Sequence, residues 1–231
     1  MPDSTPGLAV SELRWQPCFR IIASRYPTID LFERVADPED WEALYHLEAL
    51  TNPRIREQLG QIELVPRADR VFGPGASVIM APFTHLNPAG SRFADATFGV
   101  FYASESQATA IAETRHHREL FLGATKQPPT EVEMRCYLAD VIANVHDIRG
   151  KREELADLYN PDDYSASQPF GRKVKDAGID GIVYDSVRRA EGQCVAIFRP
   201  RLITHLRQSV HLSYRWNGER IDHVYEVRLI A

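Results

Sequence analysis

Short apolar segments alternate with helix signals at irregular intervals, and this pattern constrains the fold more than any other feature of the chain. The apolar segments that predict strands are residues 18–22, 98–103, 132–138, 181–186, 194–198 and 223–230. A doubly wound parallel sheet would space its strands evenly with a helix between each pair, which this chain does not do. We therefore expect an α+β fold with a mixed β-sheet core and flanking helices.

Helix signals lie between these segments. Asp37 and Pro38 form a start signal for a helix over residues 37–50, whose apolar stripe is Trp41, Leu44 and Leu47. Ser104 or Ser106 can cap a helix that ends near Phe121. Further helices are expected over residues 151–159 and from Ser167 to Gly178. Residues 65–90 contain four prolines and are expected to form a loop. No repeat or linker divides the chain, so we expect one domain over residues 1–231.

Composition excludes several classes of protein. No apolar run approaches the ~18 residues that span a bilayer, and the sequence MPDSTPGLAV lacks the pattern of a signal peptide. The formal net charge is −5, which argues against direct nucleic-acid binding. Three widely spaced cysteines favour buried thiols in a reducing compartment, so a cytoplasmic location is expected.

Common catalytic signatures are missing from the sequence. We find no phosphate-binding GxxxxGK[ST] loop, no GxGxxG turn, no HExxH and no GxSxG. The adjacent pair His116–His117 would point to different sides of a helix, so we expect no metal site.

Five polar residues stand in or beside apolar segments, where burial without a partner is costly. They are Arg20, Arg92, Tyr102, Glu113 and Ser186. From their spacing alone, a structural ion pair between arginine and glutamate and a functional site are equally compatible with the sequence.

The order of these residues resembles the RES domain family, which is named for its Arg, Glu and Ser. The matching segments are Phe19-Arg20-Ile21, Gly73-Pro74-Gly75-Ala76, Gly90-Ser91-Arg92-Phe93, Phe101-Tyr102-Ala103, Ala110-Ile111-Ala112-Glu113 and the later Ser186. Two features depart from the family pattern. Phe93 and Ala94 replace the usual Trp-Asn, and residues 30–75 form a family-variable insertion. The first ~13 residues are expected to be flexible, as chain ends often are.

The resemblance implies a bacterial toxin of a toxin–antitoxin pair, with a fold similar to that of ADP-ribosyltransferase toxins. It implies that the protein cleaves NAD+ at the nicotinamide–ribose bond, by hydrolysis or phosphorolysis, and that the antitoxin carries a helix-turn-helix domain. It also implies a homodimeric toxin within the antitoxin complex. The resemblance identifies Glu113, Arg92 and Ser186 as catalytic residues, and Arg20 and Tyr102 as residues that bind NAD+. Tyr26, which follows Arg25, is also expected to line the NAD+ pocket.

These roles agree with the chemistry of the bond to be broken. Loss of nicotinamide from ribose builds positive charge at the anomeric carbon, which a carboxylate such as Glu113 stabilises. Arginine forks suit the pyrophosphate, and the ring of Tyr102 can stack on the cationic nicotinamide. Ser186 would bond to the ribose or place Glu113.

Two alternatives to NAD+ cleavage remain open at this point. The chain could transfer ADP-ribose from NAD+ to a protein acceptor, which needs the same pocket and a different nucleophile. It could also be a non-catalytic module that binds a partner through the apolar stripe of residues 37–50.

Overall fold

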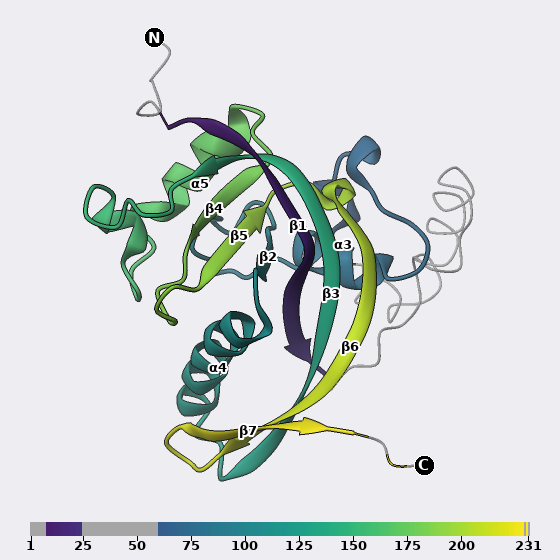
Figure 1. The fold of residues 1–231 in the computed structure, drawn as a ribbon, viewed down its shortest axis with the longest axis vertical. Coiled ribbons are helices and arrows are strands. Elements are labelled where there is room, and N and C mark those ends of the chain that lie inside the picture. The colour runs from purple at the N-terminus through teal and green to yellow at the C-terminus, as the bar shows by residue number, and fades with distance from the viewer. Residues whose placement is uncertain (1–7, 25–59, 229, 231) are drawn as a thin grey trace.

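The computed structural model describes residues 8–24, 60–228 and 230, and these form a curved, mixed β-sheet with helices packed on it (Figure 1). The strands are β1 (Val10–Ala23), β2 (Phe101–Ser104), β3 (Thr130–Asp147), β4 (Gly181–Asp185), β5 (Gln193–Ile197), β6 (Ile203–Trp216) and β7 (Ile221–Val227). The helices are α3 (Ala76–Thr84), α4 (Gln107–Ala124) and α5 (Ser167–Asp176), with short 3-10 turns at Ile62–Leu64, Arg67–Asp69, Ala156–Tyr159 and Pro200–Leu202. The expected α+β class with a mixed sheet is confirmed.

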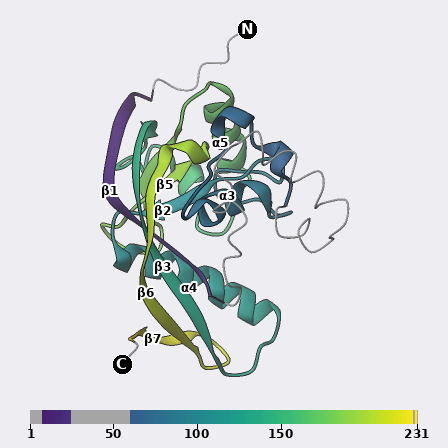
Figure 2. The same ribbon diagram turned by 90° about the vertical axis from the view of Figure 1, so that its right-hand side faces the viewer.

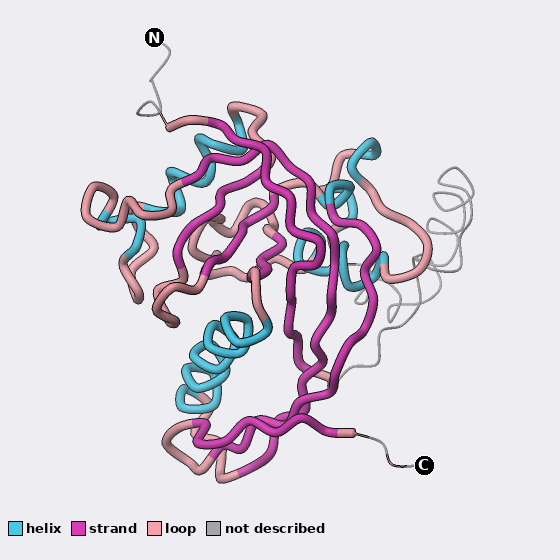
Figure 3. The backbone as a smooth tube through the Cα atoms, viewed as in Figure 1, coloured by secondary structure: helices cyan, strands magenta, loops and turns pink. Residues whose placement is uncertain are grey.

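The seven strands follow the order β1-β2-β5-β4-β3-β6-β7. Among the pairings of these described strands, β3–β4 is parallel and the others are antiparallel. An additional pairing of β1 with β3 closes the first five strands into a circuit. The long strands β3 and β6 continue past this circuit and carry β7 at the free edge, as the tube in Figure 3 shows. Turned by 90°, helices α3, α4 and α5 lie on the same side of β1, β3 and β6 (Figure 2).

Helix α4 confirms the expectation from local signals. Ser106 is its N-cap, and the Ser106 hydroxyl accepts a hydrogen bond of 3.2 Å from the backbone N–H of Thr109. The helix packs against a cluster of buried side chains on β1, β3, β6 and β7 that includes Met134, Tyr214 and Ile221. This packing places the C-terminal half of α4 on the extended end of the sheet.

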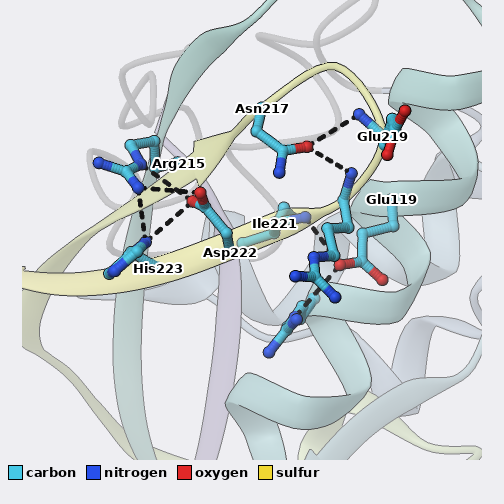
Figure 4. A network of polar contacts seen from close by, with 9 residues as sticks. Glu119, Arg215, Asn217, Glu219, Ile221, Asp222 and His223 are labelled. Carbon is cyan, nitrogen blue, oxygen red and sulfur yellow. Dashed lines mark hydrogen bonds and ion pairs between the residues drawn. The ribbon is translucent and has the colours of Figure 1, made fainter.

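Polar contacts fasten α4 to the β6–β7 hairpin (Figure 4). The carboxylate of Glu119 accepts a 2.8 Å hydrogen bond from the backbone N–H of Ile221 and a 3.2 Å bond from Arg115. Within the hairpin, the guanidinium of Arg215 donates to both carboxylate oxygens of Asp222. The helix therefore has a defined position on the sheet, which matters for the residues at its N-terminal half.

Helix α3 corrects the expectation of a loop over residues 65–90. Gly75 precedes it with φ of 82°, a conformation that favours glycine, and a Cβ there would meet Leu206. Ile79, Met80 and Phe83 are buried in the main core. Burial of this apolar face outweighs the prolines, of which Pro82 lies inside the helix.

The expected helix over residues 151–159 is also wrong, since only a 3-10 turn forms at Ala156–Tyr159. The carbonyl of Leu158 accepts a bond from the guanidinium of Arg92, and the Tyr159 hydroxyl donates to the carbonyl of Ile148 at 2.6 Å. These hydrogen bonds to distant residues stabilise the 3-10 turn in place of the expected α-helix.

Strands β1 and β6 differ most from expectation. Strand β1 begins at Val10, so residues 10–13 belong to the sheet and not to a flexible end. Strand β6 was not expected, because its polar residues hide the alternation. The helix expected over residues 37–50 and Tyr26 lie outside the described residues, as does most of the 30–75 insertion. The single-domain organisation over residues 1–231 stays a prediction.

Two further observations bear on the expectations from composition. The three cysteines are free and buried. In the described part of the chain, no helix is long and apolar enough to cross a bilayer.

Candidate active site

A cleft of about 1130 Å³ opens between α4, the edge of β1–β2 and the loops before β2 and α5. Its lining includes four of the residues expected at the site: Arg20, Arg92, Tyr102 and Glu113. They come from β1, the loop before β2, β2 itself and α4, so only the tertiary fold brings them together. The cleft volume is slightly above the upper end of the range of roughly 300–1,000 Å³ found for small-molecule pockets.

Arg20 lies on β1 and its guanidinium extends over the adjacent strand. Nη1 donates a 2.8 Å hydrogen bond to the carbonyl of Tyr102, and the guanidinium carbon lies 4.6 Å from the ring centre of Phe101. Nε is buried without a hydrogen-bond partner. Burial lowers the pKa of Arg20 to about 10, which leaves the group charged at neutral pH.

Arg92 is 7% exposed and lines the cleft. Its Nη1 donates to the carbonyls of Leu158 and Asn160 at 3.0 and 2.8 Å, and the guanidinium stacks 4.8 Å from the ring centre of Tyr164. Within the described residues, neither Arg92 nor Arg20 has a carboxylate partner. The structural ion pair between arginine and Glu113 that the sequence left open is therefore not formed.

Tyr102 lies half-buried in the cleft, with its hydroxyl fixed by the loop before β2. The hydroxyl accepts a 2.9 Å bond from the backbone N–H of Phe93 and lies 2.8 Å from the Ser91 hydroxyl. Burial raises the pKa of Tyr102 to about 12, so the hydroxyl stays protonated. The hydroxyl orders the Gly90–Phe93 segment, and the ring contributes to the lining of the cleft.

Glu113 and Ser186 meet through a short hydrogen bond. The Ser186 hydroxyl donates to Oε1 of Glu113 at 2.5 Å and accepts bonds from the backbone N–H groups of Arg188 and Arg189 at 3.1 and 3.0 Å. Ser186 is fully buried and does not line the cleft. Ser186 was expected either to bond to the ribose or to position Glu113. The geometry agrees with the second role, because Ser186 contacts Glu113 and does not line the cleft.

Several cleft residues were not identified from the sequence. Tyr164 and Cys194 line it, and Cys194 contacts Glu113 through its thiol. No periodic or motif signal marks Tyr164. Cys194 could have been suspected, because it stands on the strand that follows Ser186. The segment Gly73–Ala76, part of the family pattern, forms the start of α3 and is not part of the cleft lining.

His116 and His117 were expected to point to different sides of α4, but both line the cleft, with ring centres 5.5 Å apart. His116 and His117 follow Glu113 by three and four residues, which places all three side chains over one part of the helix surface. Burial lowers the pKa of both imidazoles; the Glu113 carboxylate opposes this shift and the positive charge of Arg188 adds to it, and the pKa of each stays below its ordinary value. They are therefore predominantly neutral at pH 7. No set of three or more His, Cys, Asp or Glu side chains suited to a metal ion occurs in the described parts of the chain.

Comparisons with known proteins place this geometry in context. The family model described as RES domain matches residues 67–217, a span that includes Arg92, Tyr102, Glu113 and Ser186. A protein of Sinorhizobium fredii (strain NBRC 101917 / NGR234), described as uncharacterized protein y4oC, is 31% identical over 211 residues, which cover 90% of this chain and 86% of the relative. A chain in the crystal structure of the M. tuberculosis MbcT–MbcA toxin–antitoxin complex aligns with a TM-score of 0.48 and 15% identity. That alignment covers 90% of this chain and 87% of the other.

Proposed function

The chain belongs to the RES domain family, and on that premise we propose that it is the toxin of a toxin–antitoxin pair that cleaves NAD+. The bond to be broken joins nicotinamide to ribose. Loss of cellular NAD+ would then arrest growth. The proposal places the reaction in the cleft that holds Glu113, and the following observations support it.

The observation that carries the proposal is a pair of arginines in the cleft wall whose hydrogen bonds go to backbone carbonyls. Arg20 and Arg92 are both held in the cleft wall, and within the described residues neither has a carboxylate partner. A buried charge without a counter-ion is costly unless a ligand supplies one. The pyrophosphate of NAD+ carries two negative charges and suits guanidinium groups. Arg20, whose Nε is buried and unpartnered, is the residue we expect to face it.

Glu113 is the cleft carboxylate that we expect to act on the ribose. In the reaction, the C1′–N bond breaks and its electron pair leaves with nicotinamide, which becomes neutral. Positive charge develops on C1′ and O4′, and the carboxylate of Glu113 stabilises it. The nucleophile then forms a bond to C1′ and loses its proton to solvent or to a neighbouring base.

Tyr102 and Arg92 would act on the substrate in different ways. The ring of Tyr102, held by the bonds of its hydroxyl, offers a face on which the nicotinamide can stack. Arg92 orders the wall around Leu158, Asn160 and Tyr164 and adds positive charge to the cleft. Tyr26 stays a prediction as an NAD+-binding residue.

The antitoxin partner follows from the family and agrees with the rim of the cleft. Leu120 and Phe121 line the cleft but are 58% and 56% exposed. Exposed apolar side chains at the rim of a cleft can be buried when a protein partner covers them. We expect a helix-turn-helix antitoxin to cover this rim and block entry of NAD+. Growth arrest on expression should be relieved by the antitoxin gene and by Glu113→Gln.

The test is product identification from NAD+ with the purified protein, with and without phosphate. Cleavage predicts free nicotinamide together with ADP-ribose or ADP-ribose 1″-phosphate. Glu113→Gln keeps the shape of the side chain and removes its charge, so the rate should fall by about 10²–10³. A folded wild-type protein that leaves NAD+ intact under both conditions would refute the proposal. If biotinylated NAD+ instead labels a protein in cell extract, the reaction is ADP-ribosyl transfer.

A further inference from the structure

The thiol of Cys194 lies against the same carboxylate oxygen that Ser186 holds. Its Sγ donates to Oε1 of Glu113 at 3.7 Å, whereas the Ser186 hydroxyl donates to Oε1 at 2.5 Å. Among the described residues, no hydrogen bond reaches Oε2 of Glu113. The two oxygens of this carboxylate therefore have different environments: one is held by protein donors and the other is left for a ligand.

Strand register places this thiol beneath α4. Cys194 on β5 is directly opposite Ser104 on β2 and Tyr184 on β4. Side chains directly opposite each other in a sheet lie on the same face. Cys194, Ser104 and Tyr184 all line the cleft with Glu113. The position of the thiol is thus set by the sheet, which is more rigid than a loop.

A hydroxyl behind the thiol completes a chain of contacts. The Ser104 hydroxyl lies 3.5 Å from Sγ of Cys194, so it can donate to the sulfur while the thiol donates to Glu113. Ser104 and Cys194 are 4% and 2% exposed. Burial raises the pKa of Cys194 well above its ordinary value, and the nearby charge of Glu113 raises it further. The sulfur therefore keeps its proton and acts as a donor.

We propose that Cys194 is a positioning residue: together with Ser186 it holds Oε1 of Glu113, so that Oε2 is the oxygen presented to the ribose of the substrate. The inference rests on the proposed function and adds an atomic assignment to it. Two donors from β5 and the end of β4 restrict the rotation of the carboxylate. Holding a catalytic group in its reactive orientation before the substrate binds is what such contacts contribute to catalysis.

The kinetic test compares Cys194→Ala with Cys194→Ser. Alanine removes the donor, and kcat for NAD+ cleavage should fall about tenfold with little change in KM, since a weak donor to a charged group is lost. Serine keeps a donor in a similar volume and should restore kcat to within about threefold of wild type. Equal loss in both variants would mean that the sulfur only fills space, and would overturn the proposal, as would a wild-type kcat in Cys194→Ala.

Cys136→Ala is the matched control. Cys136 is a buried thiol on β3 that is not part of the cleft lining. The same truncation there should leave kcat unchanged. Thermal unfolding of each variant identifies any that fails to fold, and Cys194→Ser serves as the variant in which packing is best kept.

A spectroscopic test needs no substrate. In the ligand-free protein, the infrared S–H stretch of Cys194 should lie at lower frequency than those of Cys18 and Cys136, because its thiol donates to a carboxylate. Cys194→Ser identifies the band by removing it. Glu113→Ala should shift this band to higher frequency, and an unshifted band would overturn the proposal. If the wild type left NAD+ intact while the shift occurred, NAD+ cleavage would be refuted and the positioning of Glu113 by Cys194 supported.

Discussion

The Ser186 hydroxyl donates a 2.5 Å hydrogen bond to Oε1 of Glu113, although the two residues are 73 positions apart in the chain. Ser186 stands just after β4, and Glu113 stands on α4, which packs across the sheet. The same serine oxygen accepts two backbone N–H bonds, so its proton is directed at the carboxylate. The serine therefore orients the glutamate and does not itself reach the cleft.

Replacement of Ser186 by alanine should lower kcat more than it raises KM. A hydrogen bond to a charged group is worth about 1.5–3 kcal/mol, which corresponds to a loss of about 10- to 100-fold. Ser213→Ala is a matched control, because the buried Ser213 hydroxyl donates to the carboxylate of Glu131 at 2.9 Å, away from the cleft. Steady-state kinetics with NAD+ measures kcat and KM of both variants. Equal effects of the two substitutions would contradict the role of Ser186 in orienting Glu113.

Replacement of Arg20 by methionine should weaken substrate binding without destabilising the fold. The guanidinium carries a buried charge with no carboxylate partner among the described residues, so its removal relieves a desolvation cost. We expect KM for NAD+ to rise at least about tenfold, and the melting temperature of the free protein to stay the same or rise. Arg14→Met, an exposed position on the same strand, should leave KM unchanged. An unchanged KM in Arg20→Met would remove Arg20 from the binding site.

Tyr102→Phe separates the hydroxyl from the ring. The substitution leaves the N–H of Phe93 without its acceptor in a fully buried position, at a cost of about 1–3 kcal/mol in the free energy of unfolding. Chemical denaturation measures this loss. Tyr225→Phe, on an exposed side chain of β7, should show no comparable loss. Equal stability of Tyr102→Phe and wild type would show that the hydroxyl does not hold the Gly90–Phe93 segment.

The pairing of Asp95 with Arg172 predicts a pH dependence of stability. Burial alone would raise the pKa of Asp95, but hydrogen bonds from Arg172 and Thr97 outweigh it and lower the pKa from 3.8 to about 2. A carboxylate with a depressed pKa in the folded state stabilises the protein above its unfolded pKa, and this stability is lost as pH falls through the folded pKa. Between pH 3.8 and about 2, the wild type should therefore lose more stability than Asp95→Asn. Arg172→Met should flatten the curve in the same way; parallel curves for all three proteins would contradict the prediction.

Elements with strong local signals were predicted well from the sequence. The cap at Ser106, the helix after it, the stop at Gly178 and the apolar strands β4 and β5 agree with the structure within a few residues. Elements that depend on distant partners were not. Helix α3 forms because its apolar face is buried, and β6 forms because β3 and β7 pair with it. Local propensity contains neither kind of information.

The amino-acid sequence by itself determined the fold class, the family and the identity of the polar residues, because residue type, order and spacing are properties of the linear chain. Only the tertiary structure decided how these residues divide their roles. It showed that Ser186 lies behind Glu113 and not in the cleft. It also showed that Arg92 bonds to the carbonyl of Leu158 and that the thiol of Cys194 contacts the Glu113 carboxylate. These relationships depend on strand register and on the docking of α4 against the sheet. Both are set by packing between segments far apart in sequence, which no local pattern encodes.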